Sequence, residues 1–196
     1  MDLQGMHEVT VQRSNGAFGF SVAGGAEHSA FPCVTLMPGQ QVKCEGDGEL
    51  RNGDEIIKVN QEVVLGLAHR DVVQHIVDSG DKVALTVVPP CGAVPRSLAD
   101  LLQTKNADSE TQAIVSSARR HIYELATPVT TRPRRADETD GVDYTFVSEE
   151  RFLQMRDSNA FLEFGQVGAI WYGTPKVTAD DIEQQRPQRR RDSLKV

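Results

Sequence analysis

Residues 13–25 combine a basic side chain, closely spaced glycines and two phenylalanines, a combination suited to binding an anion. Glycine adopts backbone conformations that other residues avoid, so successive N–H groups near Gly16 and Gly19 can converge on one point. Phe18 and Phe20 would wall that point with apolar surface, and residues 20–23 continue as a strand. A nest of this kind beside an unpaired strand edge suits the C-terminal carboxylate of another chain. The alternative interpretation is a glycine-rich hairpin turn without a ligand.

The composition excludes several classes of protein. With 196 residues, 39% of them hydrophobic, the chain is long enough for one domain and a smaller partner. The longest apolar runs, such as 83–88, are shorter than the roughly 20 residues of a membrane helix. A formal net charge of −7 argues against a nucleic-acid-binding protein, which needs a basic face. The N-terminus lacks a secretory signal pattern, so we expect a protein inside the cell without a membrane span.

The cysteines do not form a recognisable site. Cys33, Cys44 and Cys91 are odd in number, widely spaced and without a C-x-x-C pair. This spacing argues against a disulfide framework and against a structural zinc site. We therefore expect reduced thiols, no bound metal and no cofactor.

Hydrophobic periodicity over residues 7–90 predicts a small, mostly antiparallel sheet with one helix. Val72, Val73, Ile76 and Val77 recur at helical spacing within 68–78, and Gly80 stands where such a helix would end. Alternating or β-branched runs bounded by turn residues predict the strands. The expected strands are 7–12, 20–23, 31–37, 56–59 and 81–88.

Several motifs in this region resemble the PDZ domain family, in order and spacing. They are the loop Phe18-Gly19-Phe20, the basic Arg13 upstream, the signature Leu50-x-x-Gly53-Asp54-x-Ile56-x-x-Val59-Asn60, and His69 eleven residues before Gly80. Ala17 and Gln61 depart from the residues more usual in the family. The resemblance implies a groove for peptide C-termini. The implied peptide-binding residues are Arg13, Ala17, Phe18, Gly19, Phe20, Ser21, Val22, His69, Val73 and Ile76.

The resemblance also implies a role for each part of the groove. The amides of Phe18, Gly19 and Phe20 would hold the ligand carboxylate, with Arg13 assisting through an ordered water. An apolar pocket would take the last side chain of the ligand, which should be aliphatic.

His69 would select the ligand, because a neutral imidazole accepts a hydrogen bond from a Ser or Thr hydroxyl two residues before the ligand's end. Binding should then weaken below roughly pH 6. The alternative for His69 is a solvated residue at a helix start.

The second half of the chain predicts further helices and a hairpin. A linker precedes a helical turn at 98–102, and Ser109-x-x-Gln112 resembles a capping box before an apolar helix that Pro128 ends. A strand at 143–147, an N-cap at Ser148, and a hairpin of 161–167 with 170–173 follow. Trp171 is expected in the core. From residue 178 the polar composition predicts disorder, and Arg190-Arg191-Asp192-Ser193 has the form of a weak phosphorylation motif.

Residues 130–175 resemble the nucleotide-monophosphate-binding part of guanylate kinases. The resemblance implies phosphate contacts from Arg132, Arg135, Tyr144 and Tyr172, a guanine contact from Glu163 and a hydroxyl contact from Thr174. From their charge alone, the arginines of 132–135 are better explained by a solvated basic loop than by a phosphate site. Pro128 occupies a place where the kinases have a phosphate-binding serine.

The chain has no Gly-x-x-x-x-Gly-Lys-Ser/Thr motif with which to cradle ATP. The nearest segment, Gly48-x-x-x-x-Gly53, is followed by Asp54-Glu55, whose charges would repel a triphosphate. The sequence around the resemblance is also too short for the core sheet of the kinase. We therefore expect a guanylate-kinase-like half-domain without catalytic residues.

A PDZ domain before a kinase remnant resembles the inverted membrane-associated guanylate kinase scaffolds. The expected fold is α+β, with a PDZ-like antiparallel β-sandwich and groove helix at 7–90, a linker with one helix at 91–127, a partial α/β guanylate-kinase-like region at 128–176 and a disordered tail at 177–196. The resemblance implies a non-enzymatic adaptor for C-terminal tails of membrane, junction or signalling proteins, at the periphery of the cell membrane or cell junctions. The alternative is a module that binds a nucleotide or a phosphoprotein through the kinase-like region.

Overall fold

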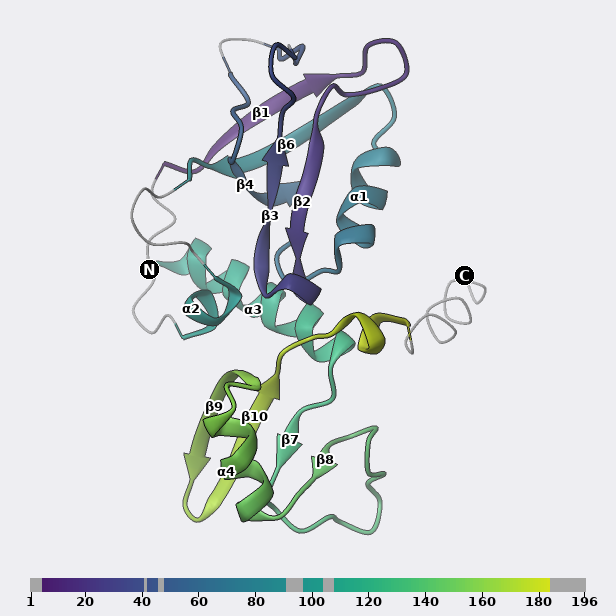
Figure 1. The fold of residues 1–196 in the computed structure, drawn as a ribbon. Helices are drawn as coiled ribbons and strands as arrows, with labels where there is room; N and C mark the ends of the chain where they lie inside the picture. The colour runs from purple at the N-terminus through teal and green to yellow at the C-terminus, as the bar shows by residue number, and fades with distance from the viewer. Residues whose placement is uncertain (1–4, 41, 46–47, 91–96, 104–107, 184–196) are drawn as a thin grey trace. The chain divides into compact units, whose positions relative to one another are not determined.

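The computed structural model describes residues 5–40, 42–45, 48–90, 97–103 and 108–183 (Figure 1). The chain divides into an N-terminal unit, residues 1–119, and a C-terminal unit, residues 120–196. Among the described residues, no helix has the length and apolar character needed to cross a membrane. Cys91 lies outside the described residues, as do the phosphorylation motif and most of the expected tail.

The N-terminal unit is built on one antiparallel sheet with strand order β1-β6-β4-β3-β2. Its strands are β1 (His7–Gln12), β2 (Ser21–Gly25), β3 (Ala30–Thr35), β4 (Glu55–Val59) and β6 (Lys82–Val88). These confirm the five strands that the periodicity predicts. The additional β5 (Glu62–Val63) pairs with β4 and is too short to show alternation.

The core of this unit follows from the alternation of its strands. In β6, Val83, Leu85 and Val87 are fully buried, whereas the residues between them are less so. Helix α1 (His69–Val77) covers the sheet with Val72 and Ile76. Gly80, at φ 73°, lies just beyond the helix and takes the left-handed conformation common after helix ends.

Two helices follow: α2 lies in the N-terminal unit, and α3 begins there and continues into the C-terminal unit. Ser97 caps α2 (Leu98–Leu102) by accepting the Asp100 N–H at 3.2 Å. The expected capping box at Ser109 is wrong by one residue, because Asp108 caps α3 (Ser109–Leu125). The Asp108 carboxylate accepts the N–H of Thr111 at 2.8 Å and its hydroxyl at 3.1 Å. A carboxylate at an N-cap binds these donors more strongly than a hydroxyl does.

The C-terminal unit contains a four-stranded sheet of order β8-β7-β10-β9. Its strands are β7 (Val129–Thr130), β8 (Thr145–Phe146), β9 (Phe161–Val167) and β10 (Ile170–Pro175). The predicted hairpin is therefore confirmed as β9–β10, while β7, parallel to β8, was not predicted. Ser148 caps α4 (Glu149–Asp157) as expected, accepting the Arg151 N–H at 3.2 Å.

Aromatic rings form the core of the C-terminal unit. Phe152 of α4 stacks on Phe161 and Trp171, with ring centroids 4.7 and 5.7 Å apart. Trp171, which was expected in the core, is partly buried and packs against it. Gly173 is required beside them, because a Cβ there would lie 2.8 Å from the Phe161 ring.

The expected disorder does not begin at residue 177. Residues 179–183 are helical, Asp181 and Thr178 cap each other, and Val177 and Ile182 are buried. Burial of these two apolar side chains is sufficient to order the polar segment locally. The rest of the predicted tail, 184–196, lies outside the described residues.

Candidate functional site

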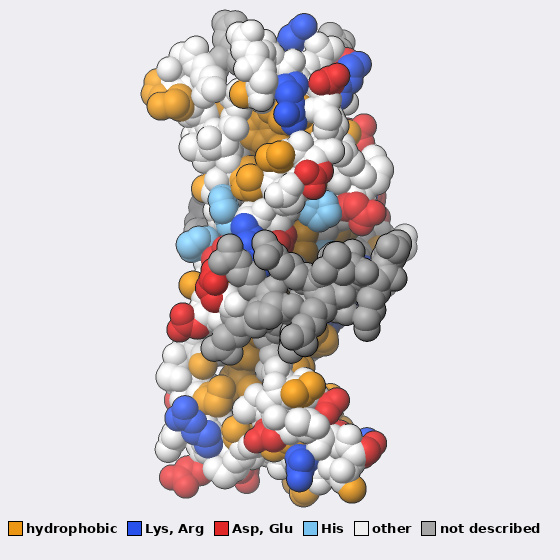
Figure 2. Space-filling model, turned by 90° about the vertical axis from the view of Figure 1, so that its right-hand side faces the viewer, with side chains coloured by type: hydrophobic (Ala, Val, Ile, Leu, Met, Phe, Trp, Pro, Cys, Tyr) orange, Lys and Arg blue, Asp and Glu red, His pale blue; other side chains and the backbone are white. Residues whose placement is uncertain are grey.

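A groove of about 470 Å³ lies between β2 and α1 of the N-terminal unit. On the face of this unit shown in Figure 2, hydrophobic side chains lie in a hollow bordered by charged side chains and histidines. Nine of the ten predicted peptide-binding residues line the groove, together with Gly16 and Val77, which were not predicted. Gly19 instead lines a neighbouring cavity.

The loop at the end of the groove presents backbone donors. Ser14 and Ala17 close it with reciprocal hydrogen bonds of 2.7 and 3.0 Å. Gly16 and Gly19 have φ angles of 81° and 80°, which glycine adopts without strain. Within the described part of the chain, the N–H groups of residues 18–20 have no hydrogen-bond acceptor. These donors are therefore available to an anion, as a peptide carboxylate requires.

The strand beside the groove also has an open edge. Among the described strands, β2 pairs with β3 and lies at the edge of the sheet. Its other side faces α1 across the groove. An extended peptide in this position can add a strand to the sheet.

Arg13 connects the loop to the end of α1. Its Nη2 donates to the carbonyl of Val77 at 2.9 Å, and its guanidinium lies 4.6 Å from the ring centroid of Phe18. Its buried Nε–H has no acceptor among the described residues. A buried donor without a partner is costly, so this N–H favours a ligand or water at the end of the groove.

His69 opens α1 and is held by two other segments. Its Nδ1 lies 3.1 Å from the carbonyl oxygen of Gly24. Because a carbonyl only accepts, Nδ1 carries the proton of the neutral ring and Nε2 is left as an acceptor. The Glu27 carboxylate accepts the backbone N–H of His69 at 3.0 and 3.1 Å. Glu27 thus caps a helix whose own N-cap, Ala68, has no polar side chain.

Two glycines allow this close approach. Gly24 and Gly25 have φ angles of 84° and 124°, at a register shift between β2 and β3. A Cβ on Gly24 would lie 2.1 Å from the Phe31 carbonyl oxygen, and one on Gly25 would lie 2.7 Å from the His69 nitrogen. Glu27 and these glycines were not among the predicted site residues. A glycine pair inside a strand is the signal that could have indicated a bulge there.

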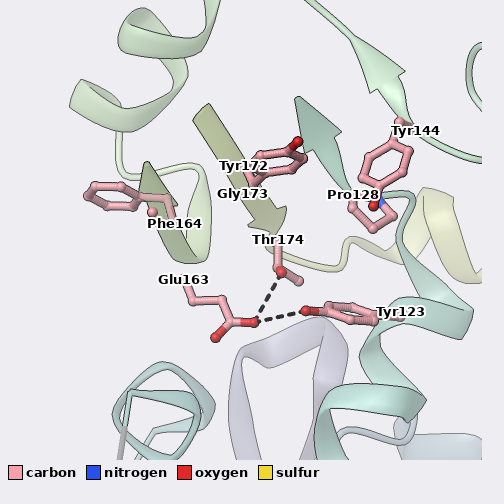
Figure 3. A pocket seen from close by; sticks show the side chains of 9 residues that line it. Tyr123, Pro128, Tyr144, Glu163, Phe164, Tyr172, Gly173 and Thr174 are labelled. Carbon is pink, nitrogen blue, oxygen red and sulfur yellow. Dashed lines mark hydrogen bonds between the residues drawn. The ribbon is translucent and has the colours of Figure 1, made fainter. Parts of the chain in front are cut away.

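A second pocket, of about 340 Å³, lies in the C-terminal unit. Figure 3 shows Glu163, Thr174 and Tyr123 converging within it, with Tyr172 and Tyr144 close by. Of the six residues predicted for phosphate or nucleotide, Tyr144, Glu163, Tyr172 and Thr174 line the pocket. Tyr123, Pro128, Phe164, Gly165 and Gly173 complete it. Arg132 and Arg135 do not line it.

Arg132 is paired with a carboxylate of its own loop. Its Nη1 and Nη2 donate to the two carboxylate oxygens of Glu138 at 2.9 and 2.6 Å, and both side chains are only 13% exposed. The Arg132 guanidinium lowers the pKa of Glu138 to about 2, assisted by the backbone N–H of Arg135. Glu138 in turn raises the pKa of Arg132 above its ordinary value. The charge implied to bind phosphate is therefore already neutralised.

Replacing Glu138 by glutamine is expected to destabilise the C-terminal unit at pH 7. The pKa of Glu138 is about 2 in the folded protein, which is below the roughly 4.3 of a glutamate in an unfolded chain. The stabilisation of the fold by ionised Glu138 is therefore fully present above about pH 4.3 and is lost as the pH falls through 2. Thermal unfolding followed by Trp171 fluorescence should show the wild type losing its advantage over Glu138→Gln between pH 5 and pH 2. A constant difference between the two proteins would contradict the ion pair.

Two family models match the chain: "PDZ domain" over residues 8–88 and "Guanylate kinase" over residues 103–189. "Membrane-associated guanylate kinase, WW and PDZ domain-containing protein 3" of Xenopus tropicalis is 32% identical over 163 residues, which cover 81% of this chain and 14% of the relative. A "Guanylate kinase" of Rhizobium etli is 47% identical over 60 residues, 31% of this chain and 26% of the relative.

A solved structure is also similar to the first part of the chain. It is the "PDZ domain from choanoflagellate SHANK1 (mbSHANK1) bound to GIRK3 peptide", 28% identical, covering 44% of this chain and 94% of that one with a TM-score of 0.38. The chain spans 12% to 14% of the length of its relatives from Xenopus and Rattus norvegicus. It carries a PDZ domain followed by a guanylate-kinase-like segment, and is a homologue of the membrane-associated guanylate kinases with WW and PDZ domains.

Proposed function

We propose that this chain is a non-enzymatic adaptor that captures the C-terminal tails of other proteins in the groove between β2 and α1. The observation that carries the proposal is the set of N–H groups at residues 18–20, which lack acceptors in the described structure, beside the open edge of β2. A peptide C-terminus supplies both the carboxylate for the donors and the strand for the edge. The match of residues 8–88 to the PDZ domain family agrees with this.

The groove also has a place for the last side chain of the tail. Phe18, Phe20, Val73 and Ile76 supply its apolar lining. Burial of one aliphatic side chain there would contribute on the order of 2 kcal/mol. We therefore assign the chain a preference for tails that end in Val, Leu or Ile.

His69 supplies the preference for Ser or Thr two residues before the end of the tail. With Nδ1–H donating to Gly24, Nε2 is the nitrogen that accepts a ligand hydroxyl. A labelled free-acid peptide ending Thr-x-Val should bind the full chain with a Kd on the order of micromolar by fluorescence anisotropy. Failure of every such peptide to bind would refute the adaptor function.

Replacing His69 by phenylalanine is expected to weaken the binding of the Thr-x-Val peptide. The variant has no Nε2, so the hydrogen bond to the ligand hydroxyl is lost. The loss of one hydrogen bond of about 1 kcal/mol corresponds to about a fivefold change in Kd. A Val-x-Val peptide, which has no hydroxyl, is the control and should change less. Equal changes for both peptides would remove His69 from the selectivity site.

We also propose boundaries for the parts of the chain and a place in the cell where it acts. We assign residues 7–90 to the PDZ domain, 91–127 to the linker and 128–176 to the guanylate-kinase-like region. A peptide-capturing homologue of membrane-associated scaffolds would act at the inner periphery of the cell membrane or of cell junctions.

We further propose that the guanylate-kinase-like segment transfers no phosphoryl group. Its sequence offers no loop that could hold the phosphates of ATP. Purified protein should form no ADP from ATP and GMP, and measurable ADP formation would overturn the assignment. A phosphate or phosphopeptide site is not favoured either, because the pocket lining contains one carboxylate and no lysine or arginine.

A further inference from the structure

We propose that the pocket of the C-terminal unit binds the guanidinium group of an arginine side chain on a partner protein. The pocket collects all three tyrosines of the chain, Tyr123, Tyr144 and Tyr172, together with the carboxylate of Glu163 (Figure 3). Neither a lysine nor an arginine is among its lining residues. Such a lining attracts cations and repels phosphate.

The aromatic rings give the first reason for a cation. The face of an aromatic ring is negative, and a guanidinium within about 6 Å of it is attracted. The rings of Tyr144 and Tyr172 lie edge to face, 6.3 Å apart, and form one side of the pocket. A flat cation that covers the rings of Tyr144 and Tyr172 would also remove apolar surface from water.

The carboxylate gives the second reason, and it also selects the type of cation. The hydroxyls of Tyr123 and Thr174 both donate to Glu163 Oε1 at 3.2 Å, which fixes the orientation of the carboxylate in the pocket. A guanidinium presents parallel N–H donors in one plane, which match a carboxylate and at the same time stack on aromatic rings. The ammonium group of lysine is a compact, strongly hydrated charge and fits this lining less well.

The C-terminal unit already contains an arginine that pairs with a carboxylate and lies close to aromatic rings. Arg132 pairs with both oxygens of Glu138 and lies 5.3 and 5.4 Å from the ring centroids of Tyr144 and Phe146. Because Glu138 neutralises this guanidinium, the charge of Arg132 opposes a second cation only weakly. The proposed ligand would therefore repeat a contact that the fold makes internally.

The test compares two probes that differ in charge but hardly in shape. Acetyl-arginine methylamide and acetyl-citrulline methylamide are titrated into the ¹⁵N-labelled full chain, and the amide signals of Gly165, Gly173 and Thr174 are followed. The arginine probe should shift these signals to saturation, and the citrulline probe should not. Equal shifts from both probes, or shifts from neither, would overturn the proposal.

Two variants extend the test to the carboxylate. Glu163→Gln should weaken the binding of the arginine probe at least about tenfold, since a hydrogen bond to a charged group is lost. Glu150→Gln, on the exposed face of α4 and outside the pocket, is the matched control and should bind like the wild type. Undiminished binding by Glu163→Gln would overturn the proposal, as would saturable binding of GMP that the arginine probe cannot displace.

Discussion

A Thr-x-Val peptide is expected to lose about thirtyfold or more of its affinity for this chain when its terminal carboxylate is converted to an amide. The free acid would accept hydrogen bonds from the N–H groups of residues 18–20, which have no acceptor among the described residues. A hydrogen bond to a charged group contributes about 1.5 to 3 kcal/mol, and 2 kcal/mol corresponds to about thirtyfold in Kd.

The nature of the loop explains why the amide should bind so poorly. A carboxamide has one oxygen acceptor, carries no charge and places an NH₂ donor against a nest that is itself made of donors. The adjacent guanidinium of Arg13, with its Nε–H lacking an acceptor in the described structure, adds to the preference for an anion.

Fluorescence anisotropy with the two peptides measures the difference directly. An amidated peptide carrying one additional upstream glutamate controls for net charge, and it should remain as weak as the simple amide. Comparable affinities of the acid and the amide would show that the carboxylate is not held by the loop.

Replacing Gly24 by alanine is expected to lower the free energy of unfolding of the N-terminal unit by about 3 kcal/mol or more. The backbone at Gly24 has φ 84°, a conformation that costs a residue with a side chain roughly 1 to 2 kcal/mol. Its Cβ would in addition lie 2.1 Å from the carbonyl oxygen of Phe31, so the backbone must move. That movement also displaces the carbonyl that accepts the proton of His69.

Gly80→Ala separates the two costs. Gly80 has φ 73°, but a Cβ there would meet no atom within 4 Å. It should therefore cost only the conformational part, about 1 to 2 kcal/mol. Hydrogen exchange of the Leu85 amide, in the central strand β6, reports the stability of this unit. Equal losses for the two variants would mean that the contact between Gly24 and Phe31 is not a constraint.

The elements of the N-terminal unit were predictable because their signals are local. Val83, Leu85 and Val87 alternate strictly, and the helix that begins at His69 has its apolar residues at helical spacing. The short strands β5 and β7 were not predictable, because two residues cannot display a period. Most of the groove lining followed from its motifs, which fix the register of loop, strand and helix.

The contacts that cap α1 and that pair Arg132 with a carboxylate could not be predicted from the sequence. Glu27 caps a helix 42 residues further along the chain, and no local pattern marks such a pair. The resemblance to guanylate kinases implied that Arg132 binds phosphate. Its true partner, Glu138, lies only six residues away, but the loop geometry that brings them together has no sequence signature.

We expect the backbone donors of the loop to bind a peptide carboxylate. The ¹H–¹⁵N spectrum of the full chain, titrated with the Thr-x-Val free acid and with its amide, tests this most directly. The acid should move the amide protons of Phe18, Gly19 and Phe20 strongly downfield, as charge-assisted hydrogen bonds do, and the amide should leave them nearly unchanged. Saturable binding of the free acid with these three signals unmoved would contradict the account.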